Sequence, residues 1–419
     1  MSDSARRFDP FAESYLADPY PLFRELRAAT PAFYCAELDH WVVTRHADVR
    51  EILAAPRIYS AANALSPLHP IGAEAAGILA ASDFRPVAAL TNNDPPDHTR
   101  VRRLANSAFR PKRVAAMESL IRELVREFLD RCRGRSGADL IGELAWQLPL
   151  RVVFRVLGIP DDDAARIKSG SDSRIQFIWG RPTPDEQRRL AHSMAEFWRY
   201  SEDLVARRTV DPRDDFTSDL ASARAGEEAA LTRGEVTTIV YGLLTAGHET
   251  TTSLIGNAFR RLLDQREAWA EICADPALIP NAVEEVLRFD SPVIAWRRRT
   301  RASSEIGGVG VPAGANLLLL LGSANRDPAV FADPERFDIR RANAGEHLSF
   351  GHGAHFCLGA PLARLEARVV LEELCASFPE MRLTRGQTLR VPANVAFRGP
   401  LSLLVEFGAA RESDRRAAD

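Results

Sequence analysis

The stretch FGHGAHFCLG, Phe350–Gly359, holds three glycines and a single cysteine, Cys357. Glycine adopts positive φ and lets the backbone approach another group closely, so this composition predicts a tight loop whose N–H groups turn toward the sulfur. Apolar residues at helical spacing follow in residues 360–378 and predict a helix whose positive N-terminal end points at Cys357. Both features favour a thiolate. The alternative is an inert buried cysteine, which the glycine framing and His355 disfavour.

The composition limits the class of protein. A chain of 419 residues, 46% of them hydrophobic, can bury a large core. The formal net charge of -3 gives no drive toward nucleic acid or an anionic membrane. The five cysteines are widely spaced and include no C-x-x-C pair, which argues against a zinc cage and a disulfide framework. A polar N-terminus and the lack of any run approaching ~20 apolar residues predict a cytoplasmic protein without a membrane segment.

All six fixed positions of the pattern Phe-Gly-x-Gly-x-His-x-Cys-x-Gly are present in Phe350–Gly359. The stretch therefore closely resembles the haem-binding loop of the cytochromes P-450. The resemblance implies that Cys357 is the proximal thiolate ligand of haem iron, that His355 reaches a haem propionate, and that Phe350 belongs to the cofactor site. A thiolate ligand donates electron density that favours O–O cleavage.

A second segment, Asn93–Arg102, carries two prolines that end any preceding helix and Asp97, which can cap the next one. His98 and Arg102 are four residues apart, share a helical face and could hold one anion together. Taken alone, such a pair is more often a solvated face. The segment resembles the part of the cytochromes P-450 that binds the haem propionates, which implies this role for both residues.

The sequence says least about which protein supplies the electrons. Five basic residues lie near the second segment: Arg100, Arg103, Arg110, Lys112 and Arg113. They form either a docking patch for an acidic electron donor or merely a soluble basic helix. Because no flavin or iron–sulfur segment follows Phe407, the resemblance implies a separate ferredoxin and ferredoxin reductase. Residues 295–325 nevertheless look somewhat like relatives that are fused to a reductase.

Residues 232–265 predict one long helix with the sequence Ala-Gly-His-Glu-Thr-Thr, residues 246–251, at its middle. A glycine and a carboxylate are unfavourable inside a buried helix, and such a violation points to function. In the cytochromes P-450 this motif lies over the distal haem face. The resemblance implies that Ala246 and Gly247 leave room for dioxygen and that Glu249 and Thr250 help to deliver protons. The alternative for Glu249 is a salt-bridged helix residue. His248, between Gly247 and Glu249, is interpreted as structural.

Three further predictions concern the scaffold and the pocket. Glu285 and Arg288 are one helical turn apart, and the resemblance implies that Arg336 joins them behind the cysteine loop. Within the triplet Arg297–Arg299, spacing compared with relatives makes Arg298 the expected propionate partner, while its two neighbours remain possible. Residues 293–295 and a turn at 395–397 are expected near the substrate.

The resemblance implies a mainly α-helical fold with a smaller β-rich part, in which residues 1–419 form a single haem-thiolate domain without a fused reductase. The cofactor, haem b, is expected between the long helix 232–265 and the cysteine loop. Residues 168–211 form a mobile lid in the family, whose apolar cluster at 175–179 faces either substrate or the core. Local patterns predict helices at 19–29, 47–54, 114–133 and 143–157 and a strand at 41–44.

The implied activity is monooxygenation by a soluble, monomeric bacterial enzyme: one oxygen atom from O2 enters a small hydrophobic or aromatic organic substrate. One alternative is a peroxide-driven oxidase, which the intact Glu249–Thr250 pair disfavours. Another is a non-catalytic haem-binding sensor. The sequence leaves open the substrate, the choice among hydroxylation, epoxidation, dealkylation and nitration, and whether the role lies in secondary metabolism or in catabolism.

Overall fold

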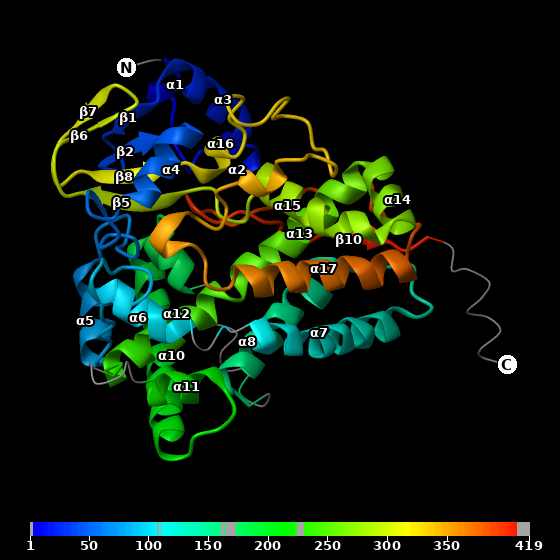
Figure 1. Ribbon diagram of the computed structural model, residues 1–419, viewed down its shortest axis with the longest axis horizontal. Helices are drawn as coiled ribbons and strands as arrows, with labels where there is room; N and C mark the ends of the chain where they lie inside the picture. The colour runs from blue at the N-terminus through cyan, green and yellow to red at the C-terminus, as the bar shows by residue number, and fades with distance from the viewer. Residues whose placement is uncertain are drawn as a thin grey trace.

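The computed structural model describes residues 3–106, 109, 111–160, 163, 173–223 and 230–408. The expected fold class is confirmed, since a large helical body is joined to a smaller β-rich part (Figure 1). The β-rich part gathers N-terminal segments and the segments that follow α15, whereas the helical body holds α7, α8, α10 and α17 (Figure 1). Among the described residues, no helix has the length and apolar character that crossing a membrane requires.

The helices cover most of the chain. In the N-terminal quarter they are α1 Asp3–Arg6, α2 Glu13–Ala17, α3 Tyr20–Ala29, α4 His46–Ala54, α5 Ala73–Ala81 and α6 Asp97–Asn106. The middle contributes α7 Pro111–Cys132, α8 Gln147–Leu157, α10 Pro184–Val210, α11 Phe216–Ser222, α12 Arg233–Ala246 and α13 Glu249–Asp264. The last are α14 Arg266–Ala274, α15 Ile279–Phe289, α16 Leu321–Ala324 and α17 Ala360–Ser377. Residues 173–179 are also helical, and a π-helical turn, Ile141–Ala145, precedes α8.

The main sheet brings together strands from distant parts of the chain. Its order is β1 (Ala32–Cys35), β2 (His40–Val43), β8 (Asn316–Leu319), β5 (Trp296–Thr300) and β3 (Tyr59–Ser60). β2 and β8 run parallel, with Trp41 opposite Leu317, and the other pairs are antiparallel. β8 is buried along Leu317–Leu319, as expected for a strand covered on both faces.

Two smaller sheets complete the β-rich elements. β4 (Gly137–Asp139), β10 (Leu404–Glu406) and β9 (Arg382–Leu383) form one, and the hairpin of β6 (Ser304–Ile306) and β7 (Val309–Val311) forms the other. In the C-terminal region, Phe397 makes an isolated bridge to Val293. This bridge brings the turn expected at 395–397 beside the segment that precedes β5.

The single long helix predicted for residues 232–265 is wrong, because α12 ends at Ala246 and α13 begins at Glu249. The Thr250 hydroxyl donates to the Ala246 carbonyl at 2.8 Å. It thus occupies a carbonyl oxygen that a backbone N–H of the next turn would bind in a continuous helix. The His248 ring is hydrogen-bonded to the Trp146 carbonyl, whose oxygen lies 2.9 Å from Nε2. A Cβ at Gly247 would lie 2.6 Å from a Val153 methyl carbon, so this close packing requires glycine.

The core beneath the cysteine loop packs α13 and α15 against α17, with Phe259, Leu287 and Val370 fully buried. α7 runs alongside α17 (Figure 1). Arg122 of α7 donates to Glu372 and Glu373 of α17 at 2.6 and 2.8 Å. The helix that follows Cys357 is therefore held by apolar packing on one face and by ion pairs on another.

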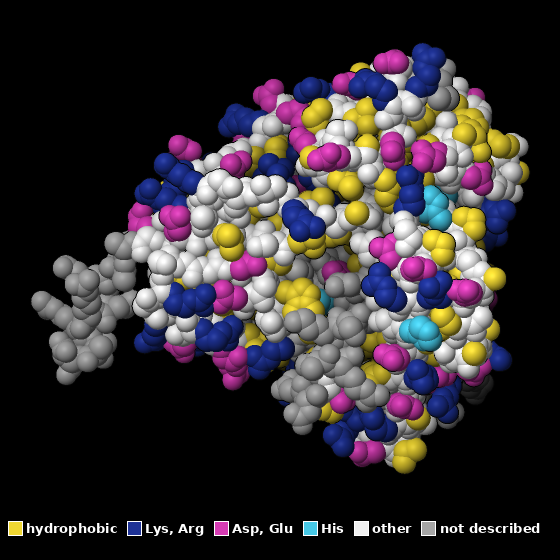
Figure 2. Space-filling model, turned by 180° about the vertical axis from the view of Figure 1, so that it is seen from behind, with side chains coloured by type: hydrophobic (Ala, Val, Ile, Leu, Met, Phe, Trp, Pro, Cys, Tyr) yellow, Lys and Arg dark blue, Asp and Glu magenta, His cyan; other side chains and the backbone are white. Residues whose placement is uncertain are grey.

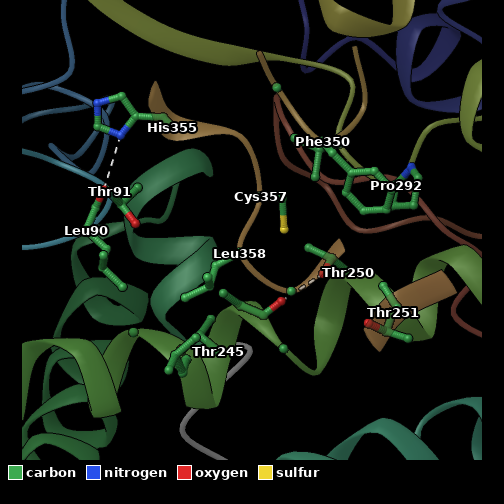
Figure 3. A pocket seen from close by; sticks show the side chains of 18 of the residues that line it. Leu90, Thr91, Thr245, Thr250, Thr251, Pro292, Phe350, His355, Cys357 and Leu358 are labelled. Atoms are coloured by element: carbon green, nitrogen blue, oxygen red, sulfur yellow. Dashed lines mark hydrogen bonds between the residues drawn. The ribbon is translucent and has the colours of Figure 1, made fainter. Parts of the chain in front are cut away.

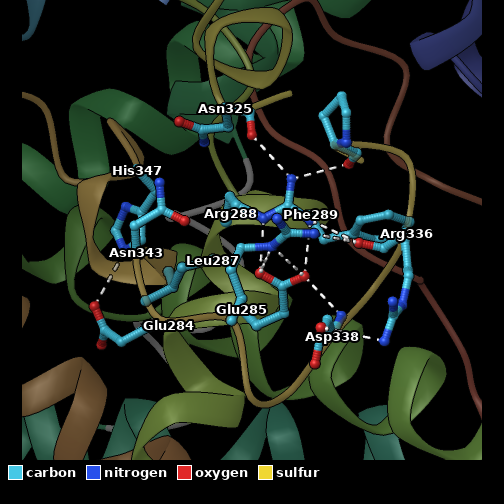
Figure 4. Close-up of polar contacts among 12 residues, drawn as sticks. Glu284, Glu285, Leu287, Arg288, Phe289, Asn325, Arg336, Asp338, Asn343 and His347 are labelled. Carbon is cyan, nitrogen blue, oxygen red and sulfur yellow. Dashed lines mark hydrogen bonds and ion pairs between the residues drawn. The ribbon is translucent and has the colours of Figure 1, made fainter. Parts of the chain in front are cut away.

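The predicted partner of Glu285 and Arg288 is also corrected. Arg288 donates to both Glu285 oxygens at 2.7 Å, as expected (Figure 4). The second arginine is Arg341, whose Nε lies 3.2 Å from Glu285, and not Arg336. Arg336 contributes only its carbonyl, which accepts from both arginines, while its side chain turns to Asp338. The chain path after Phe337, which local sequence does not reveal, brings Arg341 back to the cluster.

Candidate active site

The cysteine loop has the predicted tight turns. Gly351 and Gly353 adopt φ of 72° and 69°, which non-glycine residues rarely do. A Cβ at Gly353 would lie 2.9 Å from the Leu53 carbonyl oxygen at the end of α4. The Cys357 N–H donates to the Phe350 carbonyl at 2.9 Å, which closes the loop. The helix expected at 360–378 is confirmed as α17.

The pKa of the Cys357 thiol is raised overall, although several groups around the sulfur favour its thiolate. Burial raises the pKa of Cys357, whereas the Gly359 and Ala360 N–H groups, which donate to the sulfur, and the guanidinium groups of Arg102 and Arg364 lower it. A metal cation on the sulfur would favour the thiolate further. Figure 3 shows the sulfur pointing toward Thr250, across the pocket from the loop.

The pocket has a volume of about 310 Å³. Its walls come from the cysteine loop, α12, the start of α13, the helical residues 173–179 and the segment before β5. Eight of the ten predicted site residues line it: Arg102, Ala246, Gly247, Thr250, Arg298, Phe350, His355 and Cys357. The remaining two, His98 and Glu249, are not among its lining residues.

One end of the pocket is suited to anions. The His98 and His355 rings stack with centroids 3.9 Å apart, so His98 lies directly behind the lining. The Nε2 atoms of both rings are buried without a hydrogen-bond partner among the described residues. Burial lowers the pKa of Arg298 to about 10 and, together with Arg298 and His98, lowers the pKa of His355 to about 3. Arg102 donates to the Phe356 carbonyl at 2.8 Å.

The arginine triplet on β5 separates as strand alternation requires. Arg298 lines the pocket and, within the part of the chain that the structure describes, donates only to the Arg297 carbonyl, at 2.8 Å. Arg297 stacks on the Trp179 ring, 3.9 Å from its centroid, and donates to the Ala64 carbonyl. Arg299 lies near the surface and donates to the Gly314 carbonyl. Two guanidinium groups and two imidazoles at one end of a mainly apolar pocket fit the two propionates of a haem.

The opposite wall is the interruption between α12 and α13. Ala246, Gly247 and Thr250 face the pocket, as predicted. Glu249 instead lies with Oε1 3.5 Å from His248 Nδ1, and its side chain is 19% exposed. His248 is fully buried against Trp146, which agrees with its structural interpretation. The structure therefore brings the alcohol, and not the acid, to the pocket.

The sequence is similar to those of known proteins over most of its length. A model of the family described as Cytochrome P-450 matches residues 273–388. The cytochrome P-450 monooxygenase PikC of Streptomyces venezuelae is 35% identical over 96% of this chain and 94% of its own. The 6-deoxyerythronolide B hydroxylase of Saccharopolyspora erythraea is 35% identical over 89% of this chain and 91% of its own. This chain is a cytochrome P-450.

Solved structures of other cytochromes P-450 agree. Cytochrome P-450 CREJ in complex with (4-ethylphenyl) dihydrogen phosphate has a TM-score of 0.92 and 38% identity over 96% of this chain and 99% of its own. An intact type IV self-sufficient cytochrome P-450 monooxygenase has a TM-score of 0.94 and 37% identity, over 99% of this chain but 55% of the other. The protein is thus a bacterial-type cytochrome P-450 monooxygenase, an oxidoreductase whose cofactor is haem b. Haem supplies the activation of dioxygen when bound.

The substrate side of this cytochrome P-450 is mainly apolar. Val293 and Phe397 line it as predicted, but Ile294 and Ala295 are buried in the core behind it. From the apolar cluster expected at 175–179, three residues line the pocket, Ile175, Ile178 and Trp179. Phe177 packs instead with α5 and α10. The cluster therefore serves both roles that the sequence left open.

The lining residues that were not predicted from the sequence include two buried ionisable side chains, Glu366 and Arg174. Glu366 of α17 is 1% exposed, its Oε2 has no hydrogen-bond partner among the described residues, and burial raises its pKa well above the usual value. An acid on the apolar face of a predicted helix was the available signal. Arg174 also lines the pocket. A single arginine among polar neighbours gave no such signal.

Proposed function

We propose that this cytochrome P-450 inserts one oxygen atom from O2 into a small hydrophobic or aromatic organic substrate. The observation that carries the proposal is the Cys357 sulfur, which faces Thr250 across a mainly apolar pocket (Figure 3) that Ala246 and Gly247 also line. Exclusion of water by the apolar walls protects the chemistry at this position. The aryl ligand of the CREJ structure supports an aromatic substrate of similar size.

The proposed residue roles follow the geometry. Cys357 ligates the iron, and Phe350 packs in the cofactor site. His98, Arg102, Arg298 and His355 bind the propionates, which supply acceptors for the buried Nε2 atoms. Ala246 and Gly247 leave room for dioxygen.

We propose that Thr250 and Glu249 both take part in proton delivery, Thr250 at the pocket and Glu249 on the partly exposed side of α13. The Thr250 hydroxyl faces the pocket and holds a proton at Oγ1, which it donates to the Ala246 carbonyl at 2.8 Å. Glu249 lies next to it on the partly exposed side of α13 and takes up protons from solvent. This division is supported by the lining, which includes the alcohol and omits the acid.

We infer that residues 1–419 act as one haem-thiolate domain, a cytoplasmic monomer that receives electrons from a separate ferredoxin and ferredoxin reductase. The match to about nine-tenths of the length of the two named relatives supports the single haem-thiolate domain. All five cysteines are free, as expected in a reducing compartment. Charges of both signs are mixed over the face in Figure 2, which agrees with the absence of nucleic acid among the proposed partners.

The predicted docking patch is smaller than the sequence indicated. Arg100 is paired with Glu235, and Arg113 with Asp219. Arg103 and Lys112 are exposed and remain candidates for contact with an acidic donor. The fifth residue of the patch, Arg110, lies outside the described residues.

The test compares Cys357→Ala with Cys132→Ala, a control in a buried cysteine of α7. The reduced, carbon monoxide-bound control should show the strongly red-shifted Soret band of thiolate-ligated haem, and Cys357→Ala should lose it. An unchanged band in Cys357→Ala refutes the ligation. Product formed with ferredoxin, reductase and NADPH supports monooxygenation, whereas turnover with peroxide alone supports the oxidase instead.

A further inference from the structure

Arg174 is a cation buried in the wall of the substrate pocket. It lies in the helical residues 173–179, is 9% exposed and lines the pocket. Its guanidinium carbon is 4.7 Å from the centroid of the Tyr241 ring, and a Cβ at Gly242 would lie 3.6 Å from its Nη1. The guanidinium group therefore rests on α12, one turn before the interruption at Gly247.

No carboxylate neutralises Arg174 among the described residues. Burial lowers the pKa of Arg174, and among the described residues only Tyr241 opposes this shift. Two other deeply buried arginines, Arg208 and Arg288, pair with Asp215 and Glu285. Arg297 forms no ion pair within the described part of the chain but donates to the Ala64 carbonyl. Because an unpaired buried charge is costly and stacking on a ring compensates only in part, the site is incomplete without an anion.

The haem propionates do not account for this cation. Arg298 interacts electrostatically with His98 and His355, at the end of the pocket assigned to the propionates. Arg174 shows no such interaction with that group. Two propionates are matched by Arg102 and Arg298, so Arg174 is an additional positive charge on the substrate side.

A second polar group lies on the same helix. Thr245 lines the pocket, is 6% exposed, and its hydroxyl has no hydrogen-bond partner among the described residues. Thr245 and Tyr241 are four residues apart on α12, so they share a face with the guanidinium that stacks on Tyr241. Figure 3 shows Thr245 on α12 near Leu358, at the margin of the pocket. An unpartnered hydroxyl and an unpartnered guanidinium on one wall are complementary to an oxyanion.

We propose that the substrate carries an oxyanion, a carboxylate or a phosphate monoester, which Arg174 and Thr245 bind while its apolar body extends toward Cys357. This inference rests on the proposed function and specifies its substrate class. The apolar body would contact Ile178, Trp179 and Phe397, which line the same pocket.

The test uses three probes with the same aryl body: 4-ethylbenzoate, 4-ethylphenyl phosphate and the neutral 4-ethylbenzamide. Affinities of the ferric holoprotein are measured by the shift of the Soret band and, independently, by equilibrium dialysis. The wild type should bind at least one anion roughly tenfold or more tightly than the amide, and the tighter anion identifies carboxylate or phosphate. Arg174→Gln should lower the affinity for that anion to that for the amide, and Arg174→Lys should restore part of it.

Two controls separate the possible failures. As the first control, Arg181→Gln changes an exposed arginine that pairs with Glu37 and should keep the preference for the anion. Thr245→Val tests the second binding group and should reduce the preference several-fold. Equal affinity of the wild type for amide and anions, failure of both anions to bind, or a preference that survives in Arg174→Gln overturns the inference. The carbon monoxide spectrum of each preparation tests haem ligation separately, so a normal spectrum without anion preference overturns the inference alone.

Discussion

Replacement of Arg341 by alanine should destabilise the protein far more than the same change at Arg336. Arg341 is 9% exposed and donates to Glu285 and to the carbonyls of Ala332, Asp333 and Arg336 at 2.6, 3.2 and 2.9 Å. Its loss breaks a buried ion pair, which costs about 3–5 kcal/mol. The Arg336 side chain is 70% exposed and, among the described residues, pairs with Asp338 alone, at 3.3 Å, an interaction worth about 0–1 kcal/mol.

The assay is urea unfolding of the holoprotein followed by far-ultraviolet circular dichroism, with both variants compared with wild type in one buffer. Arg341→Lys serves as a second variant, because it keeps the charge but loses the fork that reaches several acceptors, and it should fall between wild type and Arg341→Ala. A loss below about 1 kcal/mol in Arg341→Ala, or an equal loss in Arg336→Ala, would refute the assignment of the cluster.

Three further outcomes are expected. Thr250→Ala should uncouple oxygen consumption from product and release peroxide, measured as peroxide formed per O2 consumed; unchanged coupling removes Thr250 from proton delivery. Glu366→Gln should change the free energy of unfolding at pH 7 by less than about 1 kcal/mol, because a buried protonated carboxyl and an amide are both neutral, and a larger loss in urea unfolding would contradict this. Burial disfavours the Glu284 carboxylate, but Arg364 and His347 lower its pKa to about 2. The wild type should therefore be more stable than Glu284→Gln by the full amount above about pH 4.5, and this difference in stability should disappear as the pH falls toward 2. Urea unfolding midpoints of both proteins across that pH range would show it.

The cysteine loop could be predicted because its determinants are local. Glycines at positive φ and an N-terminal helix end act within Phe350–Gly359 and the residues just after it. These features depend on residues close to one another in sequence, so one chain is sufficient to reveal them.

The rest of the site depends on contacts between distant segments. The interruption between α12 and α13 involves Trp146 and Val153, about a hundred residues earlier. The orientation of Glu249 follows from that interruption. The choice of Arg341 over Arg336 is set by the path of the chain behind the loop, and the unpaired state of Arg174 becomes visible only when every neighbour is known.

The parallel pairing of β2 with β8 has a consequence for biosynthesis. A ribosome releases Trp41 long before Leu317, on the order of tens of seconds earlier at ordinary rates of translation. Until then β2 has only β1 as a partner, and its other edge is open to pairing with foreign strands. The nascent chain therefore exposes this edge until β8 has been synthesised, and chaperones that cover the edge during expression should raise the yield of folded protein.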